Sequence, residues 1–366
     1  MKNDSAPSIS PFATIGVGIL GGIVFCAFLL GFVVPHLRGT SALPGPANPN
    51  LSFADYNRRG NDLYEQKLYK RAATEYGHMI EKNPETWDGY LLRGMAEEKA
   101  GDYQRAVRDD TEGLKHARVS QVREDLFFNR GLAYRYLGDY KAAVADYNQV
   151  IALHPNNGNA YDIRAFCYTA LGDYDRAIAD YNIGIAHDPH PGTIFERGQA
   201  YLKKKDYQKA LADLNRSIAL QPNFAPAYPL RAEAYIVLKE YDRAVADAET
   251  ASRLDNSAAN RGSLGWYQYL VGKIPESITN EQMAVKMDPK LTFARFNIAL
   301  CYAVQGSADA AKTAYQDALL VAKAPDIQGA MQDVKAALSK QPNSPALKQA
   351  QALLQNRLSQ ASSQTI

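Results

Sequence analysis

The chain has 366 residues, of which 46% are apolar and 22% charged, so it can bury a substantial core. Lysine and arginine total 41 against 39 acidic residues, and no basic stretch stands out, which argues against a nucleic-acid-binding protein. Three cysteines cannot build a disulfide framework, and we expect Cys167 and Cys301 to be small buried side chains.

The amino-terminal region predicts a membrane anchor. After a short polar tail (residues 1–11), residues 12–34 form 23 positions without a charge. A helix of that length spans the roughly 30 Å hydrocarbon layer, whereas a secretory signal has only about 7–15 apolar residues. We therefore expect an uncleaved single-pass helix, with cleavage near Thr40 as the alternative. The charges on the two sides of this segment are almost balanced, so they do not decide its orientation in the membrane. Short polar tails usually remain in the cytoplasm, and we therefore expect the rest of the chain on the non-cytoplasmic (periplasmic) side.

Glycines in this segment have two readings. Gly16, Gly18 and Gly21 match the dinucleotide pattern GxGxxG, but both flanks are apolar and no strand precedes it, which excludes a nucleotide site. Gly18 and Gly22 have the small-xxx-small spacing that lets two membrane helices pack closely, so a homodimer is left open beside the simple abundance of glycine in such helices. A linker follows over residues 35–52; its proline-rich part should be an extended, semi-stiff tether.

Residues 53–322 repeat one unit. Arginine recurs there every 33 to 37 residues, a period typical of a stacked array. The clearest copies are RGLAYRYLGDYKAAVADYNQVIALHP from Arg130 and RAFCYTALGDYDRAIADYNIGIAHDP from Arg164, and they resemble tetratricopeptide repeats. The resemblance implies an all-α fold, a right-handed α-solenoid of about eight helix–turn–helix units. In the family's numbering the units begin at Phe53, Trp87, Glu124, Gly158, Pro191, Ala225, Ala258 and Thr292.

The repeat is regular at some positions and irregular at others. Positions 8 and 20 are small in every unit, which predicts close crossing of the two helices in each hairpin. The second unit has Arg118 in place of the terminal proline, and three extra residues follow, so we expect a flexion point there. Beyond residue 322, a helical cap is predicted over 323–358, with helices at 327–339 and 344–358, and a disordered tail over 359–366.

Six units carry an arginine at position 7 and an acid sixteen residues later. Units seven and eight lose both together, with Leu264 and Asn280 in one and Ile298 and Ala314 in the other. Joint loss indicates that the two groups touch, so we predict a partly buried ladder of structural ion pairs. A row of arginines reading phosphates is the weaker alternative, because matched acids would neutralise it. The predicted pairs are Arg59 with Glu75, Arg93 with Asp109, Arg130 with Asp146, Arg164 with Asp180, Arg197 with Asp213, and Arg231 with Asp247.

The resemblance also implies a binding groove. In the family, first helices line a concave face, and positions 5 and 9 point into it. Such an apolar row favours a protein-binding groove; packing against neighbouring units or under the terminal helices is the alternative. The clamp that binds chaperone tails is not assembled, since Asn57 replaces its first lysine. The predicted groove residues are Leu91, Met95, Phe128, Leu132, Phe166, Phe195, Trp266, Phe296 and Leu300.

Motifs for chemistry are absent from the sequence. There is no HExxH, no GxSxG elbow and no P-loop, and the HxxH spacing of His187 and His190 spans a proline that ends a helix. We therefore predict no enzyme, no cofactor, no metal site and no nucleic-acid partner. The expected function is that of a membrane-tethered scaffold that binds an extended or helical segment of a protein partner. The alternatives are a self-associating assembly factor and a non-catalytic subunit that docks an enzyme.

Overall fold

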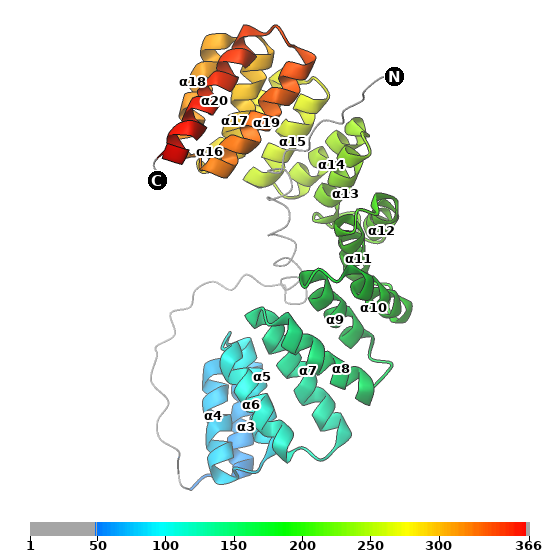
Figure 1. The fold of residues 1–366 in the computed structure, drawn as a ribbon. Helices are drawn as coiled ribbons and strands as arrows, with labels where there is room; N and C mark the ends of the chain where they lie inside the picture. The colour runs from blue at the N-terminus through cyan, green and yellow to red at the C-terminus, as the bar shows by residue number, and fades with distance from the viewer. Residues whose placement is uncertain (1–47, 49, 364–366) are drawn as a thin grey trace. The chain divides into compact units, whose positions relative to one another are not determined.

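The computed structural model describes residue 48 and residues 50–363. These residues form eighteen α-helices and contain no strand (Figure 1). They divide into two compact units, residues 48–204 and residues 205–363. The predicted anchor, residues 12–34, lies outside the described residues, and within the described part no helix is long and apolar enough to cross a membrane.

The first unit is a run of antiparallel helices in which each packs against the next. Two helices make one repeat, and the first helix of each repeat starts at or near its predicted position. The helices are α3 (Phe53–Glu65), α4 (Tyr69–Lys82), α5 (Trp87–Lys99), α6 (Tyr103–His116), α7 (Ser120–Leu137), α8 (Tyr140–Leu153), α9 (Gly158–Ala170), α10 (Tyr174–His187) and α11 (Pro191–Lys203).

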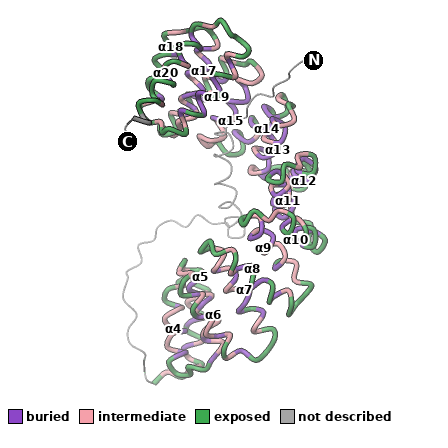
Figure 2. Tube along the Cα trace, viewed as in Figure 1, coloured by how far each residue is buried: buried purple, intermediate pink, exposed green. Residues whose placement is uncertain are grey.

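The second unit continues the same pattern and ends in two further helices. Its helices are α12 (Tyr207–Leu220), α13 (Ala227–Val237), α14 (Tyr241–Leu254), α15 (Ala258–Leu270), α16 (Ile274–Met287), α17 (Thr292–Val304), α18 (Ala308–Val321), α19 (Ala324–Lys340) and α20 (Pro345–Ser363). In both units, burial alternates along each helix, as Figure 2 shows, because one face packs inward and the other meets solvent.

Turns inside the hairpins are built from two adjacent positions. Position 15 has a positive φ in every one of the eight repeats. Position 16 is an aspartate that caps the second helix in four repeats, as Asp139 does by accepting from the Ala142 amide at 3.1 Å. Five repeats have glycine at position 15, with φ from 78° to 82°. The other three supply lysine: Lys67, Lys205 and Lys239, with φ of 60°, 64° and 62°.

The two helices of a hairpin cross closely at position 8, because a tyrosine ring of the second helix packs there. A methyl group built on Gly131 would lie 3.1 Å from the ring of Tyr147, and one built on Gly60 would overlap Tyr76. Both tyrosines stand at position 24 and are almost fully buried. The small residue at position 8 therefore receives the aromatic ring of its own second helix.

At the predicted flexion point the structure has a longer helix. The three extra residues do not form an irregular segment; they lengthen α7, which begins at Ser120. Arg123 in this added turn donates to the carbonyl of Leu114 in α6 at 3.3 Å. The junction contains neither proline nor glycine, so nothing stops helix α7 from starting one turn earlier.

The carboxyl terminus is more helical than the sequence predicts. Helix α20 passes Ser359, where we expected disorder to begin, and ends at Ser363, because residues 359–363 contain no helix breaker. Leu347 and Leu354, from the predicted apolar stripe, are fully buried.

Candidate functional site

The predicted groove residues of the first unit lie on one face of its first helices. Leu91 and Met95 belong to α5, Phe128 and Leu132 to α7, and Phe166 to α9, and all five side chains are half-buried. Their exposed portions make an apolar surface, which we call the first-helix face. Neighbouring aromatic and charged groups fix the phenylalanines.

Two contacts show how these rings are held. The ring of Phe128 meets Tyr147 edge-on, with centroids 5.6 Å apart, and Tyr140 approaches Phe166 in the same way at 6.3 Å. The guanidinium of Arg135 lies 5.0 Å from the centroid of Phe166. Each ring is thus held on one side by the interior of the unit, which preorganises the first-helix face for contact.

The other four predicted groove residues are buried. Phe195 is 2% exposed, Trp266 7%, Phe296 5% and Leu300 2%. These side chains cannot form an open apolar row, and for them the packing alternative holds. In the second unit the cause is the arrangement of the last helices.

Helix α19 covers α17 on the side turned away from the second helices. Helices α16 and α18 pack on one side of α17, and α15 flanks it along the stack. Helix α20 packs against both α18 and α17, as the first helix of a ninth repeat would. Helix α19 packs against α17 and α20 rather than α18, so the side of α17 left for it is the first-helix side (Figure 1).

The charge of α19 also acts on α15. Burial raises the pKa of the Tyr269 hydroxyl well above its usual range, and the charges of Cys301 and of Asp333 in α19 raise it further. Tyr269 stands at position 12 of α15, one turn beyond Trp266 at position 9. The chain's own helix α19 thus packs against the first helix of the eighth repeat.

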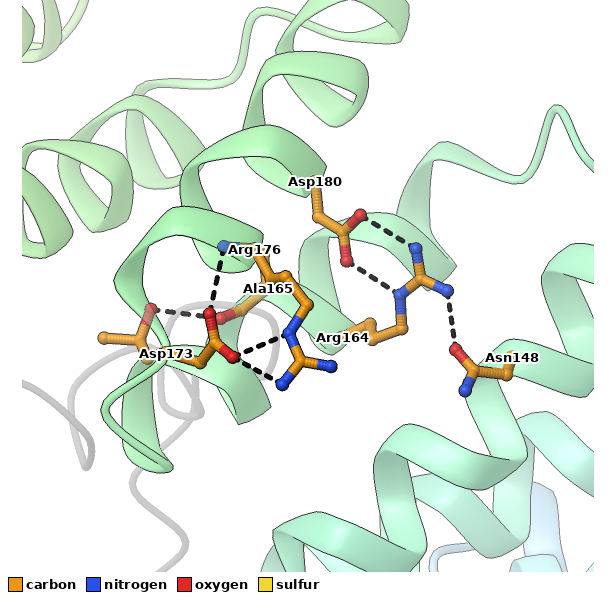
Figure 3. A network of polar contacts seen from close by, with 7 residues as sticks. Asn148, Arg164, Ala165, Asp173, Arg176 and Asp180 are labelled. Atoms are coloured by element: carbon orange, nitrogen blue, oxygen red, sulfur yellow. Dashed lines mark hydrogen bonds and ion pairs between the residues drawn. The ribbon is translucent and has the colours of Figure 1, made fainter.

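The predicted ion pairs whose two residues lie in the same compact unit, residues 48–204 or residues 205–363, have direct hydrogen bonds. In four of them both carboxylate oxygens accept from the guanidinium, as in the Arg164–Asp180 pair at 2.7 and 2.8 Å (Figure 3). The others of this form are Arg93 with Asp109, Arg130 with Asp146, and Arg231 with Asp247. Arg59 donates once to Glu75, at 3.0 Å. Arg197 and Asp213 fall in different units, and their pairing stays a prediction.

Four of the six arginines are also held by residues that the sequence analysis missed. The free end of Arg164 donates to Asn148 of the preceding repeat at 2.6 Å (Figure 3). Arg130 reaches Thr111, Arg197 reaches Asn182, and Arg231 reaches Asn215 in the same way. These partners all stand at position 25, and the recurrence of asparagine at 148, 182 and 215 was the available signal.

Aromatic rings enclose the same arginines. The guanidinium of Arg164 lies 5.3 Å from the ring of Tyr161 and 5.8 Å from that of Tyr168. Arg130 and Arg231 each lie between two rings in the same way. The hydrogen bond to Asp146 raises the pKa of Arg130 further above its usual value despite partial burial. With their charges matched and their hydrogen bonds made, these arginines form a structural ladder that also links one repeat to the next.

The seventh repeat replaces the lost pair with another network. Arg261, three residues before the position of Leu264, donates to Asn280 at 3.1 Å, and Asn280 donates to Gln268 at 2.9 Å. Next to it, Asn297 donates to the fully buried Glu281 at 2.7 Å. The joint loss of arginine and acid therefore marks a changed polar contact, and not its disappearance.

Several carboxyl groups outside the six predicted pairs are buried or half-buried. Burial raises the pKa of Glu97 and Glu196 to about 8 each, and near Glu97 the charge of Asp109 adds to the effect. Burial also raises the pKa of Asp162 to about 7; Thr193 opposes this by donating to Oδ2 at 3.0 Å, and Asp188 and Asp180 add to it. These groups are separate, and among the described residues no cluster of three or more histidine, cysteine or acidic side chains could hold a metal ion.

The two histidines of the HxxH spacing and the two described cysteines have structural roles. His190 caps α11, accepting from the Gly192 amide at 3.1 Å, and His187 ends α10. Cys167 and Cys301 are buried free thiols, and burial raises the pKa of each to about 12. Neither thiol has the lowered pKa that a reactive cysteine needs.

The repeats are those of a known family. Models of the tetratricopeptide repeat match residues 57–112, 124–157, 146–179 and 193–224. The fold is similar to a tetratricopeptide repeat protein from Parabacteroides merdae, with 18% identity and a TM-score of 0.52 over 68% of this chain and 98% of that one. It is also similar to the carboxyl-terminal part of such a protein from Cytophaga hutchinsonii, with 18% identity and a TM-score of 0.53 over 65% and 96%.

The matched residues are tetratricopeptide repeats, and the described part of the chain has the all-helical fold of proteins built from such repeats. At this identity, the two solved structures bear on the fold alone. The family's common use of the fold is protein–protein interaction, and what this chain binds has to be argued from its own surface.

Proposed function

We propose that this protein is a membrane-tethered scaffold that binds a segment of a protein partner on the first-helix face of residues 48–204. The half-buried row of Leu91, Met95, Phe128, Leu132 and Phe166 is the observation that carries the proposal. Aromatic and methionine side chains held at a surface suit a partner whose apolar side chains complete their burial. No catalytic residue is assigned, since the buried carboxyl groups and thiols stand in separate structural places.

The membrane part of the proposal comes from the sequence. Residues 12–34 have the length and composition of a spanning helix, and residues 35–52 would hold the repeats away from the bilayer. We place the repeats on the non-cytoplasmic side. Protease digestion of sealed vesicles tests this: repeats that are digested from the cytoplasmic face would contradict the topology.

Binding is tested by crosslinking in intact membranes, followed by purification of the full chain. Leu132→Glu places a charge on the first-helix face, while Leu320→Glu makes the same change on a leucine that is 82% exposed in the second unit. Proteins recovered with the wild type and with Leu320→Glu, but lost with Leu132→Glu, would support the proposal. Equal recovery with all three chains would reject the first-helix face, and recovery of crosslinked homodimers alone would favour self-association through the anchor.

A further inference from the structure

The contact between α17 and α19 indicates what kind of segment this fold accepts on its first helices. The buried apolar side chains of α19 lie on one stripe at helical spacing, and the buried Gly329 and Asp333 lie beside it. The opposite face is exposed at Gln328, Gln332 and Lys335. The stripe comprises Ile327, Ala330, Met331, Val334 and Ala337. An amphipathic helix of this chain therefore packs against α17, a first helix whose apolar residues at positions 5 and 9 are buried.

The two faces correspond position by position. Positions 5 and 9 are Phe296 and Leu300 in α17, and they are Phe128 and Leu132 in α7. With α19 in place, Phe296 and Leu300 are 5% and 2% exposed, whereas Phe128 and Leu132 are only half-buried. A helix laid on α7 in the same way would complete the burial of these side chains.

Backbone hydrogen bonding favours a helix over an extended segment. An extended peptide brings unpaired N–H and C=O groups, and each one buried without a partner weakens binding, because its hydrogen bond to water is lost and not replaced. Positions 5 and 9 of α5 and α7 offer it no side-chain donor or acceptor, since they are Leu91, Met95, Phe128 and Leu132. Asn61, at position 9 of α3, already accepts from the hydroxyl of Tyr76 at 2.8 Å. A helix satisfies its own backbone and presents only side chains.

We propose that the first-helix face of α5, α7 and α9 binds an amphipathic α-helix of the partner, seated as α19 is seated on α17. This rests on the proposed function and narrows it, because the partner then needs apolar residues at i, i+3, i+4 and i+7 with a polar opposite face. The chain's own α19 is the pattern for such a ligand.

A synthetic α19 peptide is the probe. Residues 323–341 are made with a hydrocarbon staple joining positions 328 and 332, which lie on the exposed face, and a fluorophore at the amino terminus. Fluorescence anisotropy measures its binding to the full chain. We expect saturable binding, weakened about ten-fold or more when the peptide carries Met331→Glu or the protein carries Leu132→Glu, and unchanged by Leu320→Glu.

Crosslinking to the wild-type chain gives a readout that needs no protein variant. A photoreactive benzophenone in place of Ala337 should attach the peptide to α5, α7 or α9. Attachment to α17 would mean that the peptide exchanges with α19, and attachment elsewhere or an absence of binding would also overturn the proposal. If the helical peptide fails while Leu132→Glu still abolishes partner recovery from membranes, the helical mode is wrong and the proposed function stands; if neither responds, both fail.

Discussion

The carboxylate of Asp162 in α9 lies directly over Gly184 in α10, so that a methyl group built at 184 would overlap its Oδ1. The other oxygen, Oδ2, accepts from Thr193 of α11 at 3.0 Å. Asp162 occupies position 5, where the preceding repeats have Leu91 and Phe128. One half-buried acid thus joins three helices and requires a glycine opposite it.

Gly184→Ala should destabilise the protein by about 1–3 kcal/mol, because the added methyl group forces the Asp162 carboxylate away from Thr193. In an Asp162→Ala background the same substitution should have the opposite sign. With the overlap removed, alanine in a helix is more favourable than glycine by up to about 1 kcal/mol.

Urea unfolding followed by circular dichroism at 222 nm measures both differences. The comparison is made between single and double variants, so that the cost of losing Asp162 cancels. A destabilisation by Gly184→Ala of the same size in both backgrounds would show that Asp162 does not determine the need for glycine.

The same acid predicts a dependence on pH. The pKa of Asp162 is raised from its ordinary 3.8 to about 7 in the folded chain. Between these values the folded state holds a proton that the unfolded state has lost, so stability falls as pH rises, by up to about 1.4 kcal/mol per pH unit. Below about pH 4 both states are protonated, and above about pH 7 both are ionised, so the effect is confined to this window.

Asp162→Asn keeps the shape and the acceptor for Thr193 but cannot ionise. Relative to the wild type, this variant should gain stability progressively from pH 4 to pH 7 and no further above it. Urea unfolding at pH 4, 5, 6, 7 and 8 measures the difference. Glu97 and Glu196 titrate in both proteins and cancel in the comparison. A constant difference across the series would mean that Asp162 is ionised when folded.

The Arg130–Asp146 pair predicts non-additive losses. Its side chains are 18% and 5% exposed, and two hydrogen bonds of 2.8 and 2.7 Å join them. Arg130→Met leaves a buried carboxylate unpaired, and Asp146→Ala leaves a guanidinium between two rings without its acid. Each single change should cost about 3 kcal/mol, and the double variant should cost clearly less than their sum.

Arg59 and Glu75 provide the matched comparison, since the Arg59 side chain is 49% exposed and makes one bond at 3.0 Å. For this exposed pair, the difference between the sum of the two single losses and the loss in the double variant, which is the coupling energy, should be under about 1 kcal/mol. Equal coupling energies for the two pairs, measured by urea unfolding, would contradict the role of burial.

The sequence predicts the structural features that recur in every repeat. It does not predict features that depend on packing between helices of different kinds. The helix starts at Trp87, Gly158 and Ala258 follow from the period, because every unit solves the same packing problem. The arrangement of α19 breaks that period. Its apolar stripe fits either a ninth repeat or a helix laid across the first helix of the preceding repeat, and only the packing of α20 against α18 decides between them.

Polar contacts show the same division. Arg164 and Asp180 could be paired from their recurrence, and Asn148 could have been added on the same ground. Arg261 with Asn280 and Asp162 with Gly184 occur once each, so no recurrence points to them. Phe128 is half-buried and Phe296 is buried, although both residues occupy position 5, and the helix that holds Phe296 packs against α19.

Lysines at the hairpin turns give the last prediction. Lys67 and Lys239 adopt φ of 60° and 62°, a conformation that costs an ordinary side chain roughly 1–2 kcal/mol and glycine nothing. Lys67→Gly and Lys239→Gly should each stabilise the protein by about 0.5–1 kcal/mol, after the larger entropy of glycine in the unfolded chain is subtracted. Gly138→Lys, at φ 78° with open space around its Cα, should destabilise by a similar amount. Urea unfolding measures all three, and a loss of stability in both lysine-to-glycine variants would show that these turns have interactions that outweigh the strain of their backbone.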